Sequence, residues 1–298
     1  MKITNLIYLV LASFLIIGSL SAQTPKWVST EVQKRNVVLE HFTGIIGFSP
    51  LGDRAANQLA QYYPNKIIII NNYCGIFGTY SRVIDYLILT TDEGECIWDE
   101  ISMQKYELYK EVCLYSPEGS INRSHIPWSI NSREWALSAK NIMDGNSVVN
   151  LYVKPSIDFT ARELTVEVEY YYTDDSKASV NFLSVMLLQN EIVGFMDDAK
   201  GNPEYAINDS LYRHMHVLRK EITSGGAWGE PITTTTKGSY GLKKYTMVLP
   251  DSIKNVPLDI TKLEVAAFIS ENTGNIYTGH NAVIEVPEDI RTDLAVEI

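Results

Sequence analysis

Three cysteines, Cys74, Cys96 and Cys113, are the residues of this chain best suited to redox chemistry. Because an odd number of cysteines cannot all pair within one chain, at least one thiol is expected to lack an intrachain disulfide. Cys96 and Cys113 flank a stretch with helical spacing, and they could form a disulfide if their Cα atoms come within bonding range. The alternative is that both stay reduced. Cys74 follows a buried apolar run and is predicted to be a small core residue.

A histidine pair is the second feature with chemical potential. His214 and His216 alternate along a predicted strand, so their side chains are expected to share one face, and such a pair can supply two metal ligands. No third ligand stands near them in the sequence. We therefore predict a surface or core pair whose members are hydrogen-bonded to neighbouring groups, in preference to a metal site.

Motifs of other reaction classes are absent from the sequence. It contains neither a Gly-x-Ser-x-Gly nucleophile elbow nor a phosphate-binding Gly-x-x-x-x-Gly-Lys-Ser/Thr loop. The sequence therefore predicts no catalytic residue and no cofactor.

The stretch from Asn36 to Tyr63 is the element that would position a reactive group. It begins with consecutive apolar residues, as in a strand buried on both faces, and it breaks at several glycines. It then resumes with helical spacing, and Pro50 suits the first turn of that helix because its missing N–H has no helical partner there. A thiolate at such a helix start would be stabilised by the helix dipole. No cysteine is present in this loop, whose residues are Ile46, Gly47, Phe48, Ser49 and Pro50.

This stretch resembles the N-terminal motif of the Omp28-related outer-membrane proteins of Bacteroidetes. In that family an Asn-Val-Val-Leu-Glu-Glu-Phe-Thr-Gly strand and turn precede a Cys-x-x-Cys-Pro loop and Gly-His-Arg-Ala-Ala. The residues shared with that pattern are Asn36 to Glu40, Phe42, Thr43, Gly44, Pro50, Gly52, Arg54, Ala55 and Ala56. The chain departs from the pattern at both cysteines and has Asp53 in place of the histidine. The resemblance implies a thioredoxin-like domain with a degenerate redox loop.

Two later segments carry the same resemblance. Ser116 to Arg123 matches a Pro-x-Gly-x-(Val/Ile)-Asn-Arg segment, which makes Pro117 a candidate cis-proline facing the redox loop. The alternative is an ordinary turn proline, because few X–Pro bonds are cis. Tyr212 to Thr236 matches a His-x-His-Val-Leu-Arg segment followed by a Gly-x-Trp-Gly turn, so the resemblance spans most of the chain.

Three parts of the chain are predicted from changes in residue pattern. Residues 1–22 combine Lys2, a short apolar run and small residues ending at Ala22, which is typical of a secretory signal peptide. Residues 23–147 are assigned to the thioredoxin-like domain, which ends with a helix from about Ser132 to Met143, with Ser132 as N-cap. Residues 148–298 change to alternating periodicity and are assigned to an all-β, immunoglobulin-like sandwich.

The alternation is clearest from Leu164 to Tyr172, where every second residue is apolar or tyrosine. Further strands are predicted over 181–189, 240–249, 263–270 and 277–286. Turn residues separate them, as expected of a sandwich.

The overall composition limits the function classes. The formal net charge of −11 argues against a nucleic-acid partner, and no stretch of the mature chain is long and apolar enough to span a membrane as a helix. We expect an exported, non-catalytic protein of the outer membrane, cell surface or periplasm, acting in adhesion or surface assembly with an envelope partner. The alternatives are a divergent periplasmic thiol-disulfide oxidoreductase and a carbohydrate- or peptide-binding module.

Overall fold

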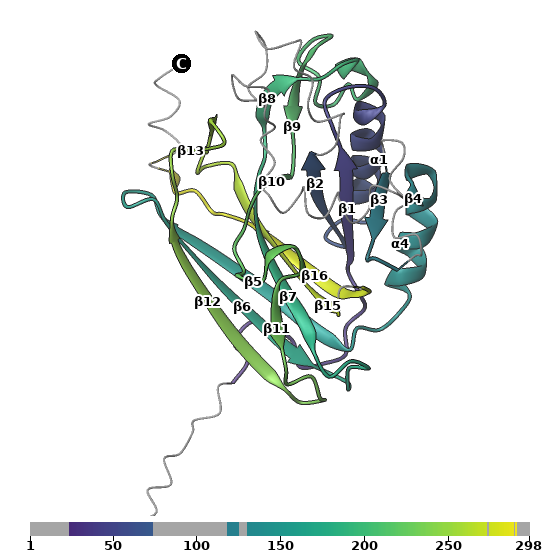
Figure 1. Cartoon of the computed structure of the whole chain (residues 1–298), viewed down its shortest axis with the longest axis vertical. Coiled ribbons are helices and arrows are strands. Elements are labelled where there is room, and N and C mark those ends of the chain that lie inside the picture. The colour runs from purple at the N-terminus through teal and green to yellow at the C-terminus, as the bar shows by residue number, and fades with distance from the viewer. Residues whose placement is uncertain (1–23, 74–117, 125–129, 273, 289, 291–298) are drawn as a thin grey trace, which may run out of the picture.

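The computed structural model describes residues 24–73, 118–124, 130–272, 274–288 and 290, which form a mostly β protein with mixed sheets (Figure 1). The helices are α1 (Ser49–Tyr62) and α4 (Trp135–Met143), with 3-10 turns η2 (Ser132–Glu134), η3 (Ala199–Gly201) and η4 (Gly226–Trp228). The strands of the first half are β1 (Val37–Thr43), β2 (Ile67–Tyr73), β3 (Glu118–Ile121) and β4 (Ile130–Asn131). The later strands are β5 (Val149–Asp158), β6 (Glu163–Tyr172), β7 (Asn181–Gln189), β8 (Ile192–Phe195), β9 (Leu211–His214), β10 (Val217–Glu221), β11 (Glu230–Ile232), β12 (Tyr240–Val248), β13 (Ser252–Ile253), β14 (Val256–Pro257), β15 (Leu263–Glu271) and β16 (Ile276–Val283).

The main sheet has nine strands within the described residues. Their order is β16-β15-β7-β10-β2-β1-β3-β4, and β11 pairs with one end of β7. β1 and β2 are parallel and are joined through α1, and the strand and helix predicted within Asn36 to Tyr63 are confirmed. β3 runs antiparallel to β1, and β4 runs antiparallel to β3.

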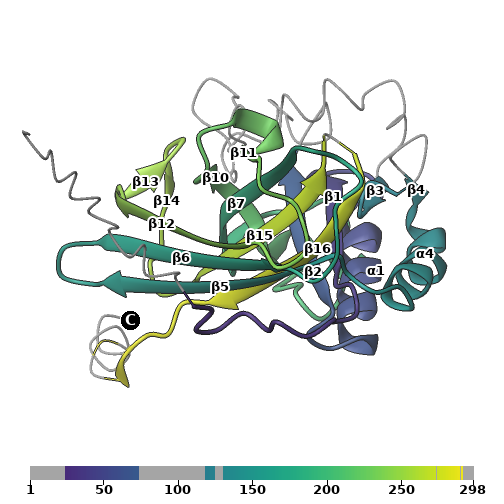
Figure 2. The same cartoon turned by 90° about the horizontal axis from the view of Figure 1, so that it is seen from below.

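Both helices pack on one face of β1 to β4 and lie side by side there (Figure 2). The core between them and the sheet contains Leu39, Ile69 and Trp135, all nearly inaccessible to solvent. Pro50 stands in the first turn of α1, as predicted. The predicted N-cap at Ser132 is wrong, because Ser132 opens a 3-10 turn and α4 begins three residues later, after Glu134.

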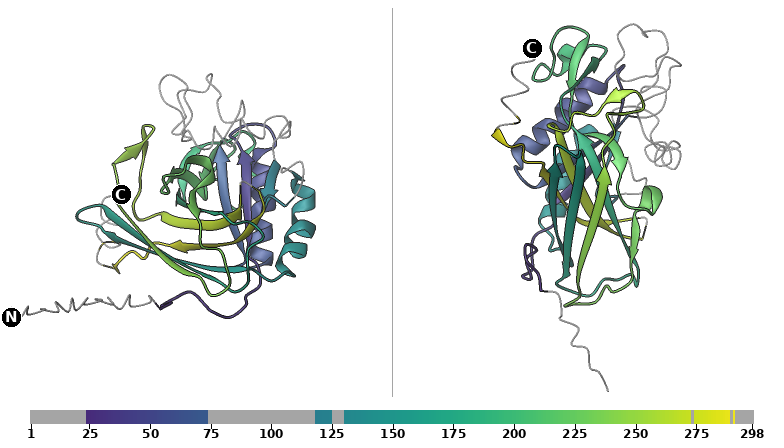
Figure 3. Two further views of the ribbon diagram at one scale, coloured as in Figure 1. Left: turned by 60° about the horizontal axis from the view of Figure 1, so that its bottom comes forward. Right: turned by 90° about the vertical axis from the view of Figure 1, so that its left-hand side faces the viewer.

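The second sheet has the order β12-β6-β5 and packs face to face against β7, β15 and β16, away from the helices (Figure 3). The alternation predicted for β6 is confirmed, because each of its apolar positions is buried between the two sheets. A fully buried side chain of this size contributes about 1.5–3 kcal/mol relative to an exposed one. The buried residues of β6 are Leu164, Val166, Val168, Tyr170 and Tyr172.

The main sheet crosses the boundary that the sequence predicted between two domains. The helical part ends at Met143 and the alternating strands begin at Val149, but β10 pairs in parallel with β2. Val217 is opposite Asn71, and the Asn71 N–H donates to the His216 carbonyl at 2.9 Å. Strands of both halves therefore share one hydrogen-bonded sheet, and the division into domains stays a prediction.

β16 covers the face of β1 and β2 opposite the helices. β16 and β1 approach so closely at Gly279 that a Cβ there would lie 2.5 Å from Cγ2 of Val38. Asn122, at positive φ after β3, joins three strands: its Oδ1 accepts from the Val38 N–H and its Nδ2 donates to the Ile276 carbonyl. These contacts attach the last strand to the first.

The segment before β1 forms a strap on the outer face of the second sheet. The Glu169 carboxylate accepts hydrogen bonds from the backbone N–H groups of Lys26, Trp27 and Val28, at 2.8–3.2 Å. The Tyr240 hydroxyl donates to the same carboxylate at 3.0 Å. Burial alone would raise the pKa of Glu169, but these donors lower it below its usual value. An ionised Glu169 therefore holds the strap in place.

Candidate functional site

The five residues predicted as a degenerate redox loop span the end of the β1–α1 loop and the first turn of α1. Gly47 has φ of 67°, the left-handed conformation that glycine adopts without strain. Ser49 begins α1, is completely buried, and donates from Oγ to the Ile46 carbonyl at 2.8 Å. Pro50 is also buried, whereas Phe48 projects into solvent with 67% of its surface exposed. The serine at the position of a redox cysteine is thus inaccessible from outside.

The β8–β9 hairpin, contributed by the second half of the chain, packs against both ends of this loop. Both the hairpin and the start of α1 lie at the end of the molecule where β1 and β2 terminate (Figure 1). The Asp197 N–H donates to the Ile45 carbonyl at 2.8 Å. A Cβ at Gly201 would lie 3.3 Å from the Pro50 side chain, so η3 packs directly on the first turn of α1. The hairpin therefore seals the helix start.

A buried carboxyl group lies beneath the sealed loop. Asp53, in α1, is 4% exposed. Its Oδ1 accepts from the Thr43 hydroxyl at 3.3 Å and lies 3.5 Å from Nδ1 of His41. Burial raises the pKa of Asp53 to about 7, and hydrogen bonds from Thr43 and Tyr212 offset part of that rise. The neutral and ionised forms of this carboxyl are therefore close in free energy near neutral pH.

His41 is held as a neutral imidazole beside that carboxyl. The Asn71 side chain donates from Nδ2 to the Met215 carbonyl, so its Oδ1 is the acceptor for Nδ1–H of His41 at 2.9 Å. Burial lowers the pKa of His41 to about 4, although the bond to Asn71 opposes this. Nε2 of His41 has no hydrogen-bond partner among the described residues.

The two histidines predicted as a strand pair occupy different backbone environments. β9 ends at His214, and His216 has φ of 52°, so the pair does not alternate along one strand as expected. His214 donates from Nε2 to the Phe195 carbonyl at 3.1 Å and accepts from the Tyr73 hydroxyl at 2.7 Å. Burial lowers the pKa of His214 to about 3. Both ring nitrogens of His214 are therefore engaged by protein groups.

His216 pairs with a carboxylate instead. Its Nδ1 lies 2.6 Å from Oε1 of Glu264. Burial alone would lower the pKa of His216, but the Glu264 carboxylate raises it above its usual value. In the part of the chain that the structure describes, no three His, Cys, Asp or Glu side chains are grouped as metal ligands.

Several predicted site residues lie outside the described residues. They are the candidate cis-proline Pro117, the candidate disulfide pair Cys96 and Cys113, and Cys74. Their roles stay predictions.

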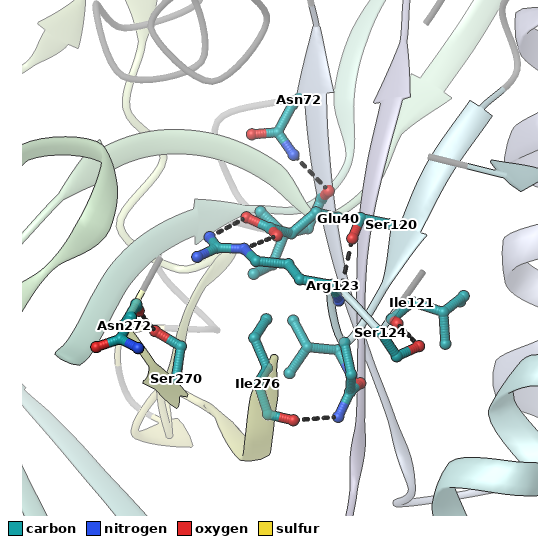
Figure 4. Close-up of polar contacts among 12 residues, drawn as sticks. Glu40, Asn72, Ser120, Ile121, Arg123, Ser124, Ser270, Asn272 and Ile276 are labelled. Atoms are coloured by element: carbon teal, nitrogen blue, oxygen red, sulfur yellow. Dashed lines mark hydrogen bonds and ion pairs between the residues drawn. The ribbon is translucent and has the colours of Figure 1, made fainter. Parts of the chain in front are cut away.

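A buried ion pair on the other face of β1 was missed by the sequence analysis. Arg123 donates to Glu40 from Nε at 2.6 Å and from Nη2 at 2.8 Å, and both side chains are inaccessible to solvent (Figure 4). The Arg123 guanidinium also lies 5.1 Å from the centre of the Phe268 ring. The sequence shows Asn122 and Arg123 together after β3, but no nearby residue indicated that Arg123 would pair with Glu40 on β1.

These features define a mostly β protein in which a helix-covered sheet and a two-sheet sandwich share strands. The family model for outer membrane protein Omp28 matches residues 103–289, which is more than half of the chain. The chain therefore belongs to the Omp28 family, as the resemblance predicted. It is an exported protein of the outer membrane, cell surface or periplasm. The match includes the segments around Arg123 and His214 but not the stretch around Ser49.

Solved structures from Porphyromonas gingivalis are similar to the chain at low identity. HBP35 of that organism has a TM-score of 0.60 at 16% identity, covering 85% of this chain and 76% of HBP35, so the two share a fold. A domain of the outer membrane lipoprotein Omp28 has a TM-score of 0.30 at 16% identity, covering 47% of this chain and 89% of that domain. No curated protein matches the chain. Among the described helices, none is long and apolar enough to cross a bilayer.

Proposed function

We propose that the protein acts in the cell envelope by binding, in adhesion or surface assembly, and that it does not catalyse thiol–disulfide exchange. In this proposal its first half is a thioredoxin-like unit that has lost the Cys-x-x-Cys motif, and its second half is an immunoglobulin-like sandwich. The strand order β2-β1-β3-β4, with the first pair parallel and both helices on one face, supports the thioredoxin-like assignment.

The closed helix start is the observation that carries the proposal. Thiol–disulfide exchange requires a thiolate that a partner disulfide can approach. At the corresponding position Ser49 is completely buried, and η3 packs over Pro50. A serine hydroxyl forms neither a stable thiolate nor a disulfide, so both the chemistry and the access are lost.

An insulin-reduction assay tests the proposal. The wild-type protein is compared with a triple variant carrying Cys74→Ser, Cys96→Ser and Cys113→Ser, and both are expected to show no turnover. Turnover by the wild type that the triple variant lacks would favour a divergent oxidoreductase and overturn the proposal.

A second variant distinguishes two causes of inactivity: the absence of cysteines from the loop, and the burial of position 49 away from a partner disulfide. Ile46→Cys with Ser49→Cys restores the Cys-x-x-Cys spacing, and we expect it to stay inactive because position 49 is buried beneath the hairpin. Activity in this variant would show that the hairpin opens and that position 49 is accessible to a partner disulfide, contrary to the proposal.

A further inference from the structure

A small pocket lies beside the strap, where the strap meets β5, β16 and the start of β2. Its volume is about 190 Å³, below the roughly 300 Å³ at which pockets for drug-sized molecules begin. The pocket therefore has room for a group the size of one small ring, and not for a helix or a large cofactor. The residues of its lining that bear on the choice of ligand are Trp27, Gln33, Lys34, Asn36, Lys66 and Tyr152.

The strap wall of the pocket is held in place by hydrogen bonds within the chain. Asn150, which also lines the pocket, is 5% exposed and donates from Nδ2 to the carbonyls of Ser29 and Glu31, each at 2.7 Å. These bonds and those accepted by Glu169 hold the strap beside β5 (Figure 2). A preformed wall favours binding because little conformational entropy is lost when the ligand arrives.

The charge of the pocket is opposite in sign to that of the whole chain. Among the described residues of the lining, the charged ones are Lys34 and Lys66, and both are exposed. Lys34 donates from Nζ to the Asp144 carbonyl at 2.7 Å, and Lys66 donates to Oδ1 of Asn36 at 3.3 Å. An ammonium group has three donors, so each lysine keeps two for a ligand. Two cations in one small pocket favour an anionic group.

The carboxylates near the pocket are bound elsewhere or lie outside its lining. The Asp144 carboxylate pairs with Lys140 at 3.0 Å, and the Glu169 carboxylate binds the strap backbone. Glu31 is exposed and is not part of the lining. The positive charge of the pocket is therefore not cancelled within its described lining.

An aromatic wall stands beside these cations. The rings of Trp27 and Tyr152 have centres 6.3 Å apart and are nearly parallel, at 25°, and both side chains are half-buried. The ammonium groups of Lys26 and Lys154 lie 4.4 Å and 4.6 Å from the centre of the Trp27 ring, which stabilises its position. The wall offers dispersion contacts to the C–H groups of a ligand.

Amide groups complete the chemistry that a sugar ring requires. The side chains of Gln33 and Asn36 line the pocket, and an amide can both donate to and accept from hydroxyl groups. A pyranose ring combines hydroxyl groups with C–H groups that pack on aromatic walls. A bare anion would leave the aromatic wall unused, and a neutral sugar would leave the two lysines unused.

We propose that the pocket binds an acidic sugar, a pyranose ring that carries an anionic group. The anionic group pairs with Lys34 and Lys66, and the ring packs against Trp27 and Tyr152. This inference rests on the proposed function, because it names the ligand class of one site in a protein that acts by binding.

The test titrates the mature chain with four compounds, followed by saturation-transfer difference NMR. Glucuronate and galacturonate have both the ring and the charge, glucose has the ring alone, and acetate has the charge alone. Each uronate should bind at least tenfold more tightly than glucose or acetate. Binding of the uronates should weaken as salt is added, because the two lysines are exposed.

Pocket variants locate the binding. Lys34→Gln and Lys66→Gln should each weaken glucuronate binding about fivefold or more and leave glucose binding unchanged, whereas Tyr152→Leu should weaken both. The two lysines are exposed, so the fold is expected to persist, and circular dichroism checks this. Lys254→Gln is the matched control, since Lys254 is an exposed lysine between β13 and β14, outside the described lining.

Four outcomes would overturn the inference. Equal binding of glucuronate and acetate would show an adventitious ion only, and equal binding of glucuronate and glucose would show that charge is not selected. The other two are uronate binding that the lysine variants leave unchanged, and no binding of either uronate. Insulin reduction by the same preparation tests the proposed function separately, so an inactive protein that binds no uronate would refute only the pocket inference.

Discussion

Replacing Asp53 by asparagine should stabilise the protein, and it should do so more at pH 8 than at pH 5. The unfolded chain releases the Asp53 proton near its ordinary pKa of 3.8, whereas the folded protein releases it only near pH 7. Between pH 3.8 and pH 7 the carboxyl group of Asp53 ionises in the unfolded chain but stays protonated in the folded protein. Ionisation therefore stabilises only the unfolded state, and the free energy of unfolding falls as pH rises. Asparagine cannot ionise and avoids this loss.

The size of the effect follows from the pKa shift. One unit of pKa corresponds to about 1.4 kcal/mol. The raised pKa of Asp53 therefore lowers the free energy of unfolding by about 4 kcal/mol at pH 8. At pH 5, where the folded group is protonated, the loss is about 1.5–2 kcal/mol. The stabilisation by Asp53→Asn is thus expected to be about 2–3 kcal/mol greater at pH 8 than at pH 5.

Urea unfolding followed by tryptophan fluorescence at the two pH values measures this difference. His41 and His214 also change stability with pH, since both stay neutral when buried, and both are present in the two proteins that are compared. Asp197→Asn, at an exposed position beside the hairpin, controls for the loss of one negative charge. Equal effects of Asp53→Asn at pH 5 and pH 8, or destabilisation confined to pH 8, would refute the assigned pKa and its cause.

Three further changes follow from the contacts described. Arg123→Met leaves Glu40 buried without its cation and should lower the free energy of unfolding by about 3–5 kcal/mol in urea titrations, whereas adding Glu40→Leu should recover part of that loss. Gly279→Ala should cost about 1–3 kcal/mol because its Cβ has no room, while Gly274→Ala, where the nearest atom is 3.6 Å away, should be nearly neutral by the same measurement. Glu169→Gln should loosen the strap and speed trypsin cleavage after Lys26. An unchanged cleavage rate would contradict the role given to the ionised carboxylate.

Local periodicity predicted the strands well, because alternation of side chains is a property of consecutive residues. β7 was predicted with the bounds that the structure has, and β6 with its buried face. The cap of α4 was missed because a 3-10 turn and a helical turn differ little in sequence pattern. The histidine pair was misplaced because alternation gave no sign that His216 adopts positive φ.

Contacts between distant segments were beyond sequence reasoning. Glu40 and Arg123 are brought together only by antiparallel pairing of β1 with β3, and Asp53 is enclosed by residues from both halves of the chain. The residues of these clusters are of types that occur throughout the chain, and no regular spacing along the sequence links them. The packing of the hairpin against the redox loop likewise depends on tertiary structure.

The parallel pairing of β2 with β10 has a consequence for how the chain folds during export. The first half emerges before β10 exists, so one edge of β2 has unpaired backbone groups until almost half of the chain has followed. Such an edge can pair with other chains, and a contact between residues so far apart forms slowly. The nascent chain is therefore open to mispairing at β2 until the second half arrives.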